Sequence, residues 1–241
     1  MKKIALITGA NKGIGLETAR QLATQGVHVI IGARDAAKGS AAATKLTSEG
    51  LSAEFQLLDV TSESSIAAAA DAIAQRHGKL DILVNNAGVL LDDYGKLVSE
   101  QPLSLYRETF ETNVFGLIAT TIAFLPLLKK SAAARIVNLS STLGSIGNHS
   151  DPASHVYDTK LPAYCVSKSA VNAFTVQLAY ELKDTPHKVN AAHPGWVKTD
   201  MGGEGAPMEI VDGAKTSVRL ALLGPDGPNG GYFHMNETLP W

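Results

Sequence analysis

Short apolar runs alternate with longer segments whose apolar residues recur at helical spacing along nearly the whole chain. Apolar runs at 4–7, 27–31, 53–58, 80–84, 135–139, 187–192 and 231–234 predict strands. The spacing between them predicts helices at 16–23, 36–49, 63–76, 103–128, 162–178 and 210–223, the fourth of which is interrupted at Asn113 and Gly116. This alternation predicts an α/β fold, a single Rossmann-type doubly wound parallel sheet of about seven strands with helices on both faces.

Composition favours one domain that spans residues 1–241. The chain has 241 residues and is 45% hydrophobic and 18% charged, which suffices for one sizeable core. Its formal net charge of -2 gives no general attraction for nucleic acid or an anionic membrane. The apolar start ends at Gly9 without a signal-peptide cleavage site, and no stretch approaches the roughly 18 apolar residues of a membrane span. We therefore expect a cytoplasmic protein without membrane or nucleic-acid partners.

A glycine-rich turn separates the first predicted strand from the first helix. Residues 8–15 read Thr-Gly-Ala-Asn-Lys-Gly-Ile-Gly, so the glycines follow the spacing G-x-x-x-G-x-G. In a strand–turn–helix unit, the backbone N–H groups and the helix dipole at this turn receive a pyrophosphate. We therefore expect a dinucleotide to contact Gly9, Asn11, Lys12, Gly13, Ile14 and Gly15.

The end of the second predicted strand indicates which dinucleotide binds. Residues 32–35 read Gly-Ala-Arg-Asp, which places Arg34 where an acidic residue would favour a free ribose 2′-hydroxyl. An arginine accommodates a 2′-phosphate, so Arg34, with Lys12 and Lys38, favours NADPH over NADH. The alternative is that Asp35 is the ribose acid of an NAD-dependent enzyme, if the strand runs two residues further.

Polar or small residues follow several predicted strands. Residues 85–88 (Asn-Asn-Ala-Gly) end the fourth predicted strand, and residues 140–142 (Ser-Ser-Thr) end the fifth. In open parallel sheets, ligands bind in the crevice at the carboxyl ends of the strands. We therefore expect these segments to line a ligand site.

Tyr164 and Lys168 lie one turn apart on the helix that starts near Pro162. An ammonium about 4 Å from a phenol favours the phenolate by about 4 kcal/mol at an effective dielectric near 20. This attraction would lower the pKa of the phenol from near 10 to about 7, which makes tyrosine an acid usable at neutral pH. Because the phenol must still carry its proton to act as an acid, we expect solvent and cofactor phosphates to temper the effect.

The motifs together resemble the short-chain dehydrogenase/reductase family. They occur in the family's order over nearly the whole chain: the glycine turn, Asn85-Asn86-Ala87-Gly88, Asn113, Ser141, Tyr164-x-x-x-Lys168 and Pro194-Gly195. Lys12 and the segment 194–201 resemble more narrowly the NADPH-dependent carbonyl reductases. The resemblance implies an NADPH-dependent oxidoreductase that reduces the carbonyl of a small ketone, aldehyde or quinone to an alcohol by hydride transfer.

The resemblance also implies a role for each matching residue. Tyr164 would protonate the carbonyl oxygen as general acid, while Lys168 would lower the pKa of Tyr164 and bind the nicotinamide ribose. Ser141 would hold the same oxygen, and Asn113 would anchor a water that relays protons to Lys168. Further cofactor contacts are implied for Asp59, Val60, Asn86, Ala87, Gly88, Pro194, Gly195, Val197 and Thr199.

The segment before Tyr164 departs from the pattern of many family members, because 23 positions separate it from Ser141. We interpret residues 143–161 as an active-site loop insertion. Insertions at this point in some carbonyl reductases cover a helix face otherwise used for dimerisation, so a monomer and a homodimer both stay open here. Ser140 stays a second candidate for the serine role.

The substrate pocket is the least determined part of the sequence. Candidate lining residues are Leu91, Leu143, Trp196 and Met201, with a glycine-rich hinge at 202–205. His149, Asp151 and His155 have no spacing that fixes a metal geometry, and the single Cys165 excludes a cysteine cage, so we expect no metal. Two alternatives stay open, an NAD-dependent alcohol dehydrogenase and a non-catalytic dinucleotide-sensing protein.

Overall fold

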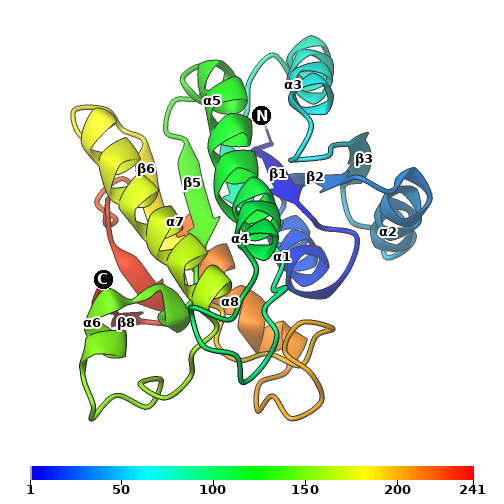
Figure 1. Ribbon diagram of the computed structural model, residues 1–241. Helices are drawn as coiled ribbons and strands as arrows, with labels where there is room; N and C mark the ends of the chain where they lie inside the picture. Colours follow the sequence, from blue (N-terminus) through cyan, green and yellow to red (C-terminus); the bar gives the residue numbers. More distant parts are fainter. Residues whose placement is uncertain (1) are drawn as a thin grey trace.

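The computed structural model describes residues 2–241 and arranges them as a central sheet between two layers of helices (Figure 1). The strands are β1 (Ile4–Thr8), β2 (His28–Ala33), β3 (Ala53–Leu57), β4 (Ile82–Asn85), β5 (Arg135–Leu139), β6 (Lys188–Ala192), β7 (Tyr232–His234) and β8 (Glu237–Thr238). The α-helices are α1 (Gly13–Thr24), α2 (Ala36–Ser48), α3 (Glu63–His77), α4 (Leu103–Phe110), α5 (Gly116–Leu128), α6 (Ile146–Ser150), α7 (Pro162–Glu181) and α8 (Ile210–Ala221).

The strand order is β3-β2-β1-β4-β5-β6-β7-β8. The chain adds β2 and β3 on one side of β1 and then returns to add β4 and the later strands on the other side, so the order of strands reverses between β1 and β4. The first seven strands are parallel, and β8 pairs antiparallel with β7. The doubly wound parallel sheet is confirmed, but the expected count of about seven strands misses β8 in the described chain. This strand has only two residues, which is too short to show an alternation of apolar and polar positions. It follows a tight turn at Met235, whose φ is 49°.

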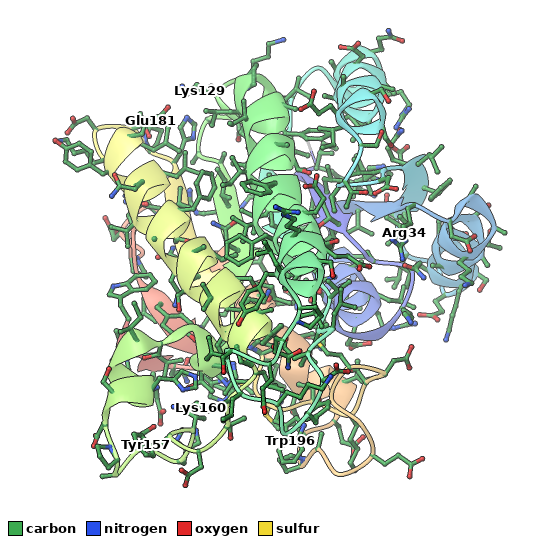
Figure 2. The ribbon with its side chains drawn as sticks, in the orientation of Figure 1. Arg34, Lys129, Tyr157, Lys160, Glu181 and Trp196 are labelled. Atoms are coloured by element: carbon green, nitrogen blue, oxygen red, sulfur yellow. The ribbon has the colours of Figure 1, made fainter. Side chains whose placement is uncertain are left out.

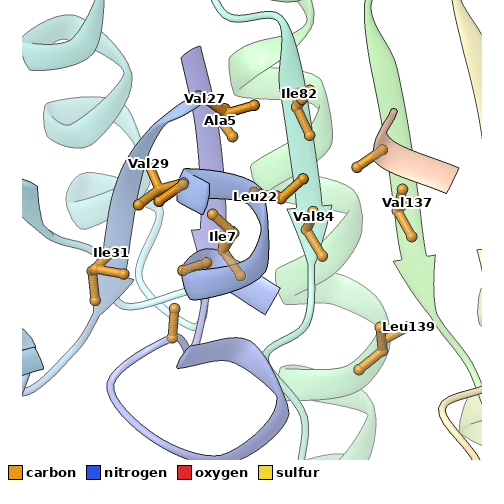
Figure 3. Close-up of a cluster of buried hydrophobic side chains, with 14 of the residues drawn as sticks. Ala5, Ile7, Leu22, Val27, Val29, Ile31, Ile82, Val84, Val137 and Leu139 are labelled. Atoms are coloured by element: carbon orange, nitrogen blue, oxygen red, sulfur yellow. The ribbon is translucent and has the colours of Figure 1, made fainter. Parts of the chain in front are cut away.

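The alternation of side chains along each strand sorts the core into two layers. Ala5, Ile7, Val29 and Ile31 face α1, α2 and α8, together with β4 and β5 residues of the same register (Figure 3). Leu6, Ile30, Leu83, Ile136 and Val189 face the other way and pack against α3, α5 and α7. Successive strand residues point to opposite faces of a sheet, so the consecutive apolar residues of the central strands supply core contacts on both faces.

The predicted helix 103–128 is continuous but changes its pitch at the expected interruption. A π-helical segment, Glu111–Phe115, lies between α4 and α5 and contains Asn113. Single π-helical turns within α-helices are frequent at functional sites. Contrary to the sequence expectation, the run Leu103–Leu128 is long and apolar enough to cross a membrane by length and composition, because an 18-residue window within it has a mean hydropathy of 1.5. Half of that window is buried inside the fold, as in a core helix.

The segment predicted as a loop insertion contains a 3-10 turn, Thr142–Gly144, and the short helix α6. Gly147 N donates to Trp241 O at 2.9 Å, and Ser145 Oγ donates to the same oxygen at 3.3 Å, so α6 packs on the end of the chain. Val166 and Tyr180 on α7 stay exposed. The segment therefore leaves this part of α7 open, and the oligomeric state stays a prediction.

Candidate active site

A cleft of about 1280 Å³ opens at the carboxyl ends of β1, β2 and β4, where the strand order reverses. Its lining includes most of the residues expected to hold a dinucleotide: Gly9, Asn11, Lys12, Gly13, Ile14, Gly15, Arg34, Asp59, Val60, Asn86, Ala87, Gly88, Tyr164, Lys168, Pro194 and Thr199. A second hollow of about 520 Å³ lies against α4 and α7. Its lining is mainly apolar, whereas most of the predicted dinucleotide-binding residues, including Tyr164 and Lys168, line the larger cleft.

The glycine turn between β1 and α1 lets the backbone approach the β4 end closely. Gly13 has a φ of 58°, which favours glycine. A Cβ atom at Gly15 would lie 2.5 Å from Asn86 Nδ2, so a larger residue does not fit there. Lys12 precedes α1 without a side-chain cap, and the first N–H groups of the helix are available to an anion.

Thr8 joins this turn to the end of β4, although no site role was predicted for it. Its hydroxyl oxygen accepts hydrogen bonds from Asn86 N and Ala87 N, both at 3.0 Å. Asn86 Nδ2 donates to Thr8 O at 2.8 Å and to Gly9 O at 3.3 Å. Asn86 therefore fixes the shape of the cleft floor, which a turn motif by itself does not reveal.

Arg34 and Asp35 differ in what their side chains contact at the end of β2. Asp35 Oδ1 accepts from Lys38 N at 3.0 Å and caps α2, and this bond is the largest cause that lowers the pKa of Asp35. Arg34 is exposed and lines the cleft (Figure 2). The guanidinium is therefore available to an anion, while the carboxylate already has a structural partner.

The loop after β6 forms the opposite lip of the cleft. Lys12 pairs with Asp200 across the opening, and Pro194 and Thr199 line it. Gly195 and Val197 lie behind the lining. A Cβ atom at Gly195 would lie 2.1 Å from the sulfur of Met208, and Val197 is buried beside α8.

Tyr164 is buried at the first turn of α7 and lines the cleft. Burial raises its pKa to about 12, and a hydrogen bond with the Ser141 hydroxyl acts in the opposite direction. The expected lowering of this pKa by Lys168 is therefore reversed in the structure. A buried phenol of this kind keeps its proton at neutral pH.

Lys168 is 4% exposed and points to the cleft floor from the same face of α7. Its Nζ donates to Leu139 O at 2.8 Å and lies 5.6 Å from the ring centre of Tyr164. Burial lowers the pKa of Lys168 to about 8. The ammonium lies beside Gly88, where a Cβ atom would be in ordinary contact with Nζ at 3.6 Å.

Asn113 lies beneath the cleft lining, and its side chain is held at both ends. Oδ1 accepts from Val89 N at 2.8 Å, and Nδ2 donates to Val89 O at 2.9 Å and to Ser167 Oγ at 3.0 Å. These bonds join the π-helical segment to the loop after β4 and to α7. Asn113 therefore sits beside the Tyr164–Lys168 turn.

The two serines after β5 point in different directions. Ser140 Oγ donates to Lys168 O at 3.3 Å, so this hydroxyl supports the helix backbone. The Ser141 hydroxyl reaches the Tyr164 phenol, although Ser141 is not among the residues that line the cleft. His193 is half-buried and neutral because loss of water lowers its pKa to about 3, and Nδ1 accepts from Thr142 N at 3.2 Å. The geometry favours Ser141 over Ser140 as the partner of the phenol.

Asp92 holds the start of α7, which the sequence did not indicate. The residue is 5% exposed and lies in the loop after β4. Oδ1 accepts from Ala163 N at 2.8 Å, and Oδ2 accepts from Tyr164 N at 3.0 Å. Leu161, the residue immediately before α7, has no side-chain group that caps the helix. A carboxylate at a helix N-terminus is stabilised by the N–H groups and the dipole, so Asp92 fixes the backbone of Tyr164 itself.

The four candidate substrate residues separate into two pairs. Leu91 and Met201 line the cleft, whereas Leu143 and Trp196 are not among its lining residues. Trp196 is 59% exposed, and its Nε1 donates to Gly202 O at 2.8 Å, which holds the indole in the loop after β6 (Figure 2).

Comparison with known proteins agrees with the geometry of this cleft. A family model described as short chain dehydrogenase matches residues 3–209. The chain is 35% identical over 279 residues to carbonyl reductase [NADPH] 1 of Mus musculus, an alignment that covers 100% of this chain and 99% of the mouse protein.

Solved structures show the same similarity in three dimensions. The NADPH-bound carbonyl reductase from chicken fatty liver superposes with a TM-score of 0.86 at 30% identity, covering 100% of this chain and 99% of that chain. Salutaridine reductase from Papaver somniferum gives a TM-score of 0.82 at 31% identity, covering 96% and 99%. This chain belongs to the short-chain dehydrogenase/reductase family.

Proposed function

We propose that this protein reduces the carbonyl group of a small ketone, aldehyde or quinone to an alcohol, with NADPH as cofactor and Tyr164 as general acid. The observation that carries the proposal is a protonated, buried phenol at a dinucleotide-sized cleft, beside Ser141 and Lys168. The similarity to a mouse carbonyl reductase supports the same reaction class.

The residues of the cleft fit NADPH. The close approach at Gly15 and the uncapped start of α1 suit a pyrophosphate, because no side chain intervenes between an anion and the N–H groups. Arg34 suits a 2′-phosphate, since a guanidinium binds phosphate through charge-assisted hydrogen bonds. Asp35 is engaged as the cap of α2, which disfavours its use as a ribose acid. When bound, NADPH supplies the hydride.

Tyr164 transfers the proton. At pH 7 its phenol is protonated because burial raises the pKa to about 12. The oxygen of a carbonyl that accepts hydride becomes strongly basic, and it takes the proton from Tyr164 Oη as the new C–H bond forms. Ser141 donates a hydrogen bond to the same oxygen and orients it toward the phenol. The products are an alcohol, the oxidised dinucleotide and the Tyr164 phenolate, so atoms and charge balance, and a proton from solvent then restores the phenol.

Lys168 stabilises the tyrosinate that proton transfer leaves behind. With a pKa near 8, its side chain is an ammonium at pH 7. The ammonium lies 5.6 Å from the centre of the Tyr164 ring, where it attracts a phenolate by about 3 kcal/mol at an effective dielectric of 20. Because the Asn113 side chain is engaged by Val89 and Ser167, we assign to its backbone carbonyl the anchoring of a water that carries the returning proton toward Lys168 and Tyr164.

Tyr164→Phe should lower carbonyl reduction by roughly 10²–10⁴-fold, because the general acid is removed while the apolar ring stays. The affinity for NADPH should change less than about twofold. Lys168→Ala should weaken both turnover and binding. The measurement is the loss of NADPH absorbance with a panel of carbonyls, beside direct NADPH binding. Tyr157→Phe, in the exposed segment before α7, is the matched control, and substantial activity in Tyr164→Phe would refute the assignment.

Arg34→Ala should raise the KM for NADPH by roughly 10–100-fold, the effect of losing a charged hydrogen bond worth about 1.5–3 kcal/mol. The KM for NADH should stay nearly the same. Lys45→Ala, an exposed cation of α2, is the control. Steady-state kinetics with both cofactors decide the point, and equal efficiency of the wild type with NADPH and NADH would remove the 2′-phosphate argument.

Asp92→Ala should lower kcat about tenfold or more while the KM for NADPH stays nearly unchanged, because the start of α7 loses two charge-assisted hydrogen bonds beside the phenol. Asp92→Asn keeps one of the two acceptor oxygens, so its kcat should lie between those of the wild type and Asp92→Ala. The neighbouring exposed Asp93→Ala is the control. An Asp92→Ala enzyme with a normal kcat but a lowered Tm would assign Asp92 to stability alone.

A further inference from the structure

A group of metal-binding side chains lies at the opposite edge of the sheet from the cleft. His28 begins β2, Glu54 lies in β3 and His77 ends α3, and one ligand atom from each lies within 4.8 Å of the others. His77 Nε2 lies 2.9 Å from Glu54 Oε1, and His28 Nε2 lies 3.5 Å from Glu54 Oε2. Two imidazole nitrogens and a carboxylate therefore face one small volume.

The His28 ring has a nitrogen without a hydrogen-bond partner in this volume. Its Nδ1 shares a hydrogen bond of 2.8 Å with Ser52 Oγ, whereas Nε2 is buried and unpaired within residues 2–241. When Nδ1 donates that bond, the lone pair of Nε2 faces the carboxylate. A neutral imidazole whose second nitrogen is hydrogen-bonded is the form that ligates metals.

Arg76 is the cation that competes for this volume. Its Nε and Nη2 lie 3.3 and 3.2 Å from Glu54 Oε1, and Nη2 also donates to Gln56 Oε1 at 2.8 Å. All of these contacts to Glu54 use Oε1, so Oε2 stays directed toward His28. The Arg76 side chain is 41% exposed, which lets it turn to solvent when another cation enters.

We propose that His28, Glu54 and His77 bind a divalent transition-metal ion, with zinc as the best match. Two imidazoles, one carboxylate and a water are a ligand set that zinc accepts in tetrahedral geometry. The donor atoms lie within 4.8 Å of one another, and a tetrahedral ion with bonds near 2.0 Å needs separations of about 3.3 Å, so small side-chain rotations suffice. The bound ion fastens the end of α3 to β2 and β3. The site is independent of the proposed reduction.

The test titrates chelator-treated full-length protein at pH 7.5 with Zn²⁺ in a calorimeter and with Co²⁺ by absorption. We expect one ion per chain, a Kd on the order of micromolar, a tetrahedral Co²⁺ spectrum, and a Tm that rises with Zn²⁺. His28→Asn and His77→Asn should each weaken binding about tenfold or more. Absence of stoichiometric binding in the wild type would overturn the proposal, as would unchanged affinity in both variants.

Two further variants separate this site from adventitious binding. His155→Asn, an exposed histidine of the segment before α7, should leave the affinity unchanged. Arg76→Gln should tighten binding severalfold because it removes the competing cation. An equal loss of affinity in His155→Asn and His28→Asn would contradict the site, as would weaker binding in Arg76→Gln. Circular dichroism without metal verifies that each variant is folded.

Discussion

The burial of Tyr164 and Lys168 against each other is the constraint on which the site depends. Loss of water disfavours the charged form of both groups, so burial raises the pKa of the phenol to about 12 and lowers that of the ammonium to about 8. As pH rises, Lys168 therefore loses its proton before Tyr164 does. The attraction of about 3 kcal/mol that an ammonium exerts at 5.6 Å is then absent when the phenol would ionise. At pH 7 the pair is a phenol beside an ammonium, as the proposed reduction requires.

The surrounding bonds keep this pair in one geometry. Asp92 holds the backbone of Tyr164, and the bond from Lys168 Nζ to Leu139 O ties the ammonium to the end of β5. A Cβ atom at Gly144 would lie 2.7 Å from that of Lys168, so the 3-10 turn packs directly on α7. Asn113 adds the π-helical segment through Ser167. Each contact joins segments that are far apart in the chain. Together they place the Tyr164 phenol and the Lys168 ammonium at the same edge of the sheet as the glycine-rich turn between β1 and α1.

The sequence predicted what depends on local pattern. The glycine turn, the alternating elements and the pitch change near Asn113 follow from neighbouring residues, and the family resemblance added the order of the motifs. Asp92 was missed because its partner N–H groups lie more than seventy positions away. The direction of the Trp196 side chain was not predictable because it depends on a hydrogen bond to Gly202 O. The strand β8 was not predictable because it depends on a turn at Met235. The pKa of Tyr164 was predicted with the wrong sign because spacing gives the distance between charges but not their loss of water.

Titration of Tyr164 by NMR tests most directly whether burial keeps its phenol protonated. The protein is labelled with ¹³C at the tyrosine Cζ atoms. The chain has six tyrosines, and Tyr164→Phe identifies the signal. We expect this signal to show no ionisation up to about pH 10, since the folded pKa lies above the ordinary value of 10.0. A Tyr164 signal that titrates near pH 7 would contradict it, because the attraction of Lys168 would then outweigh burial.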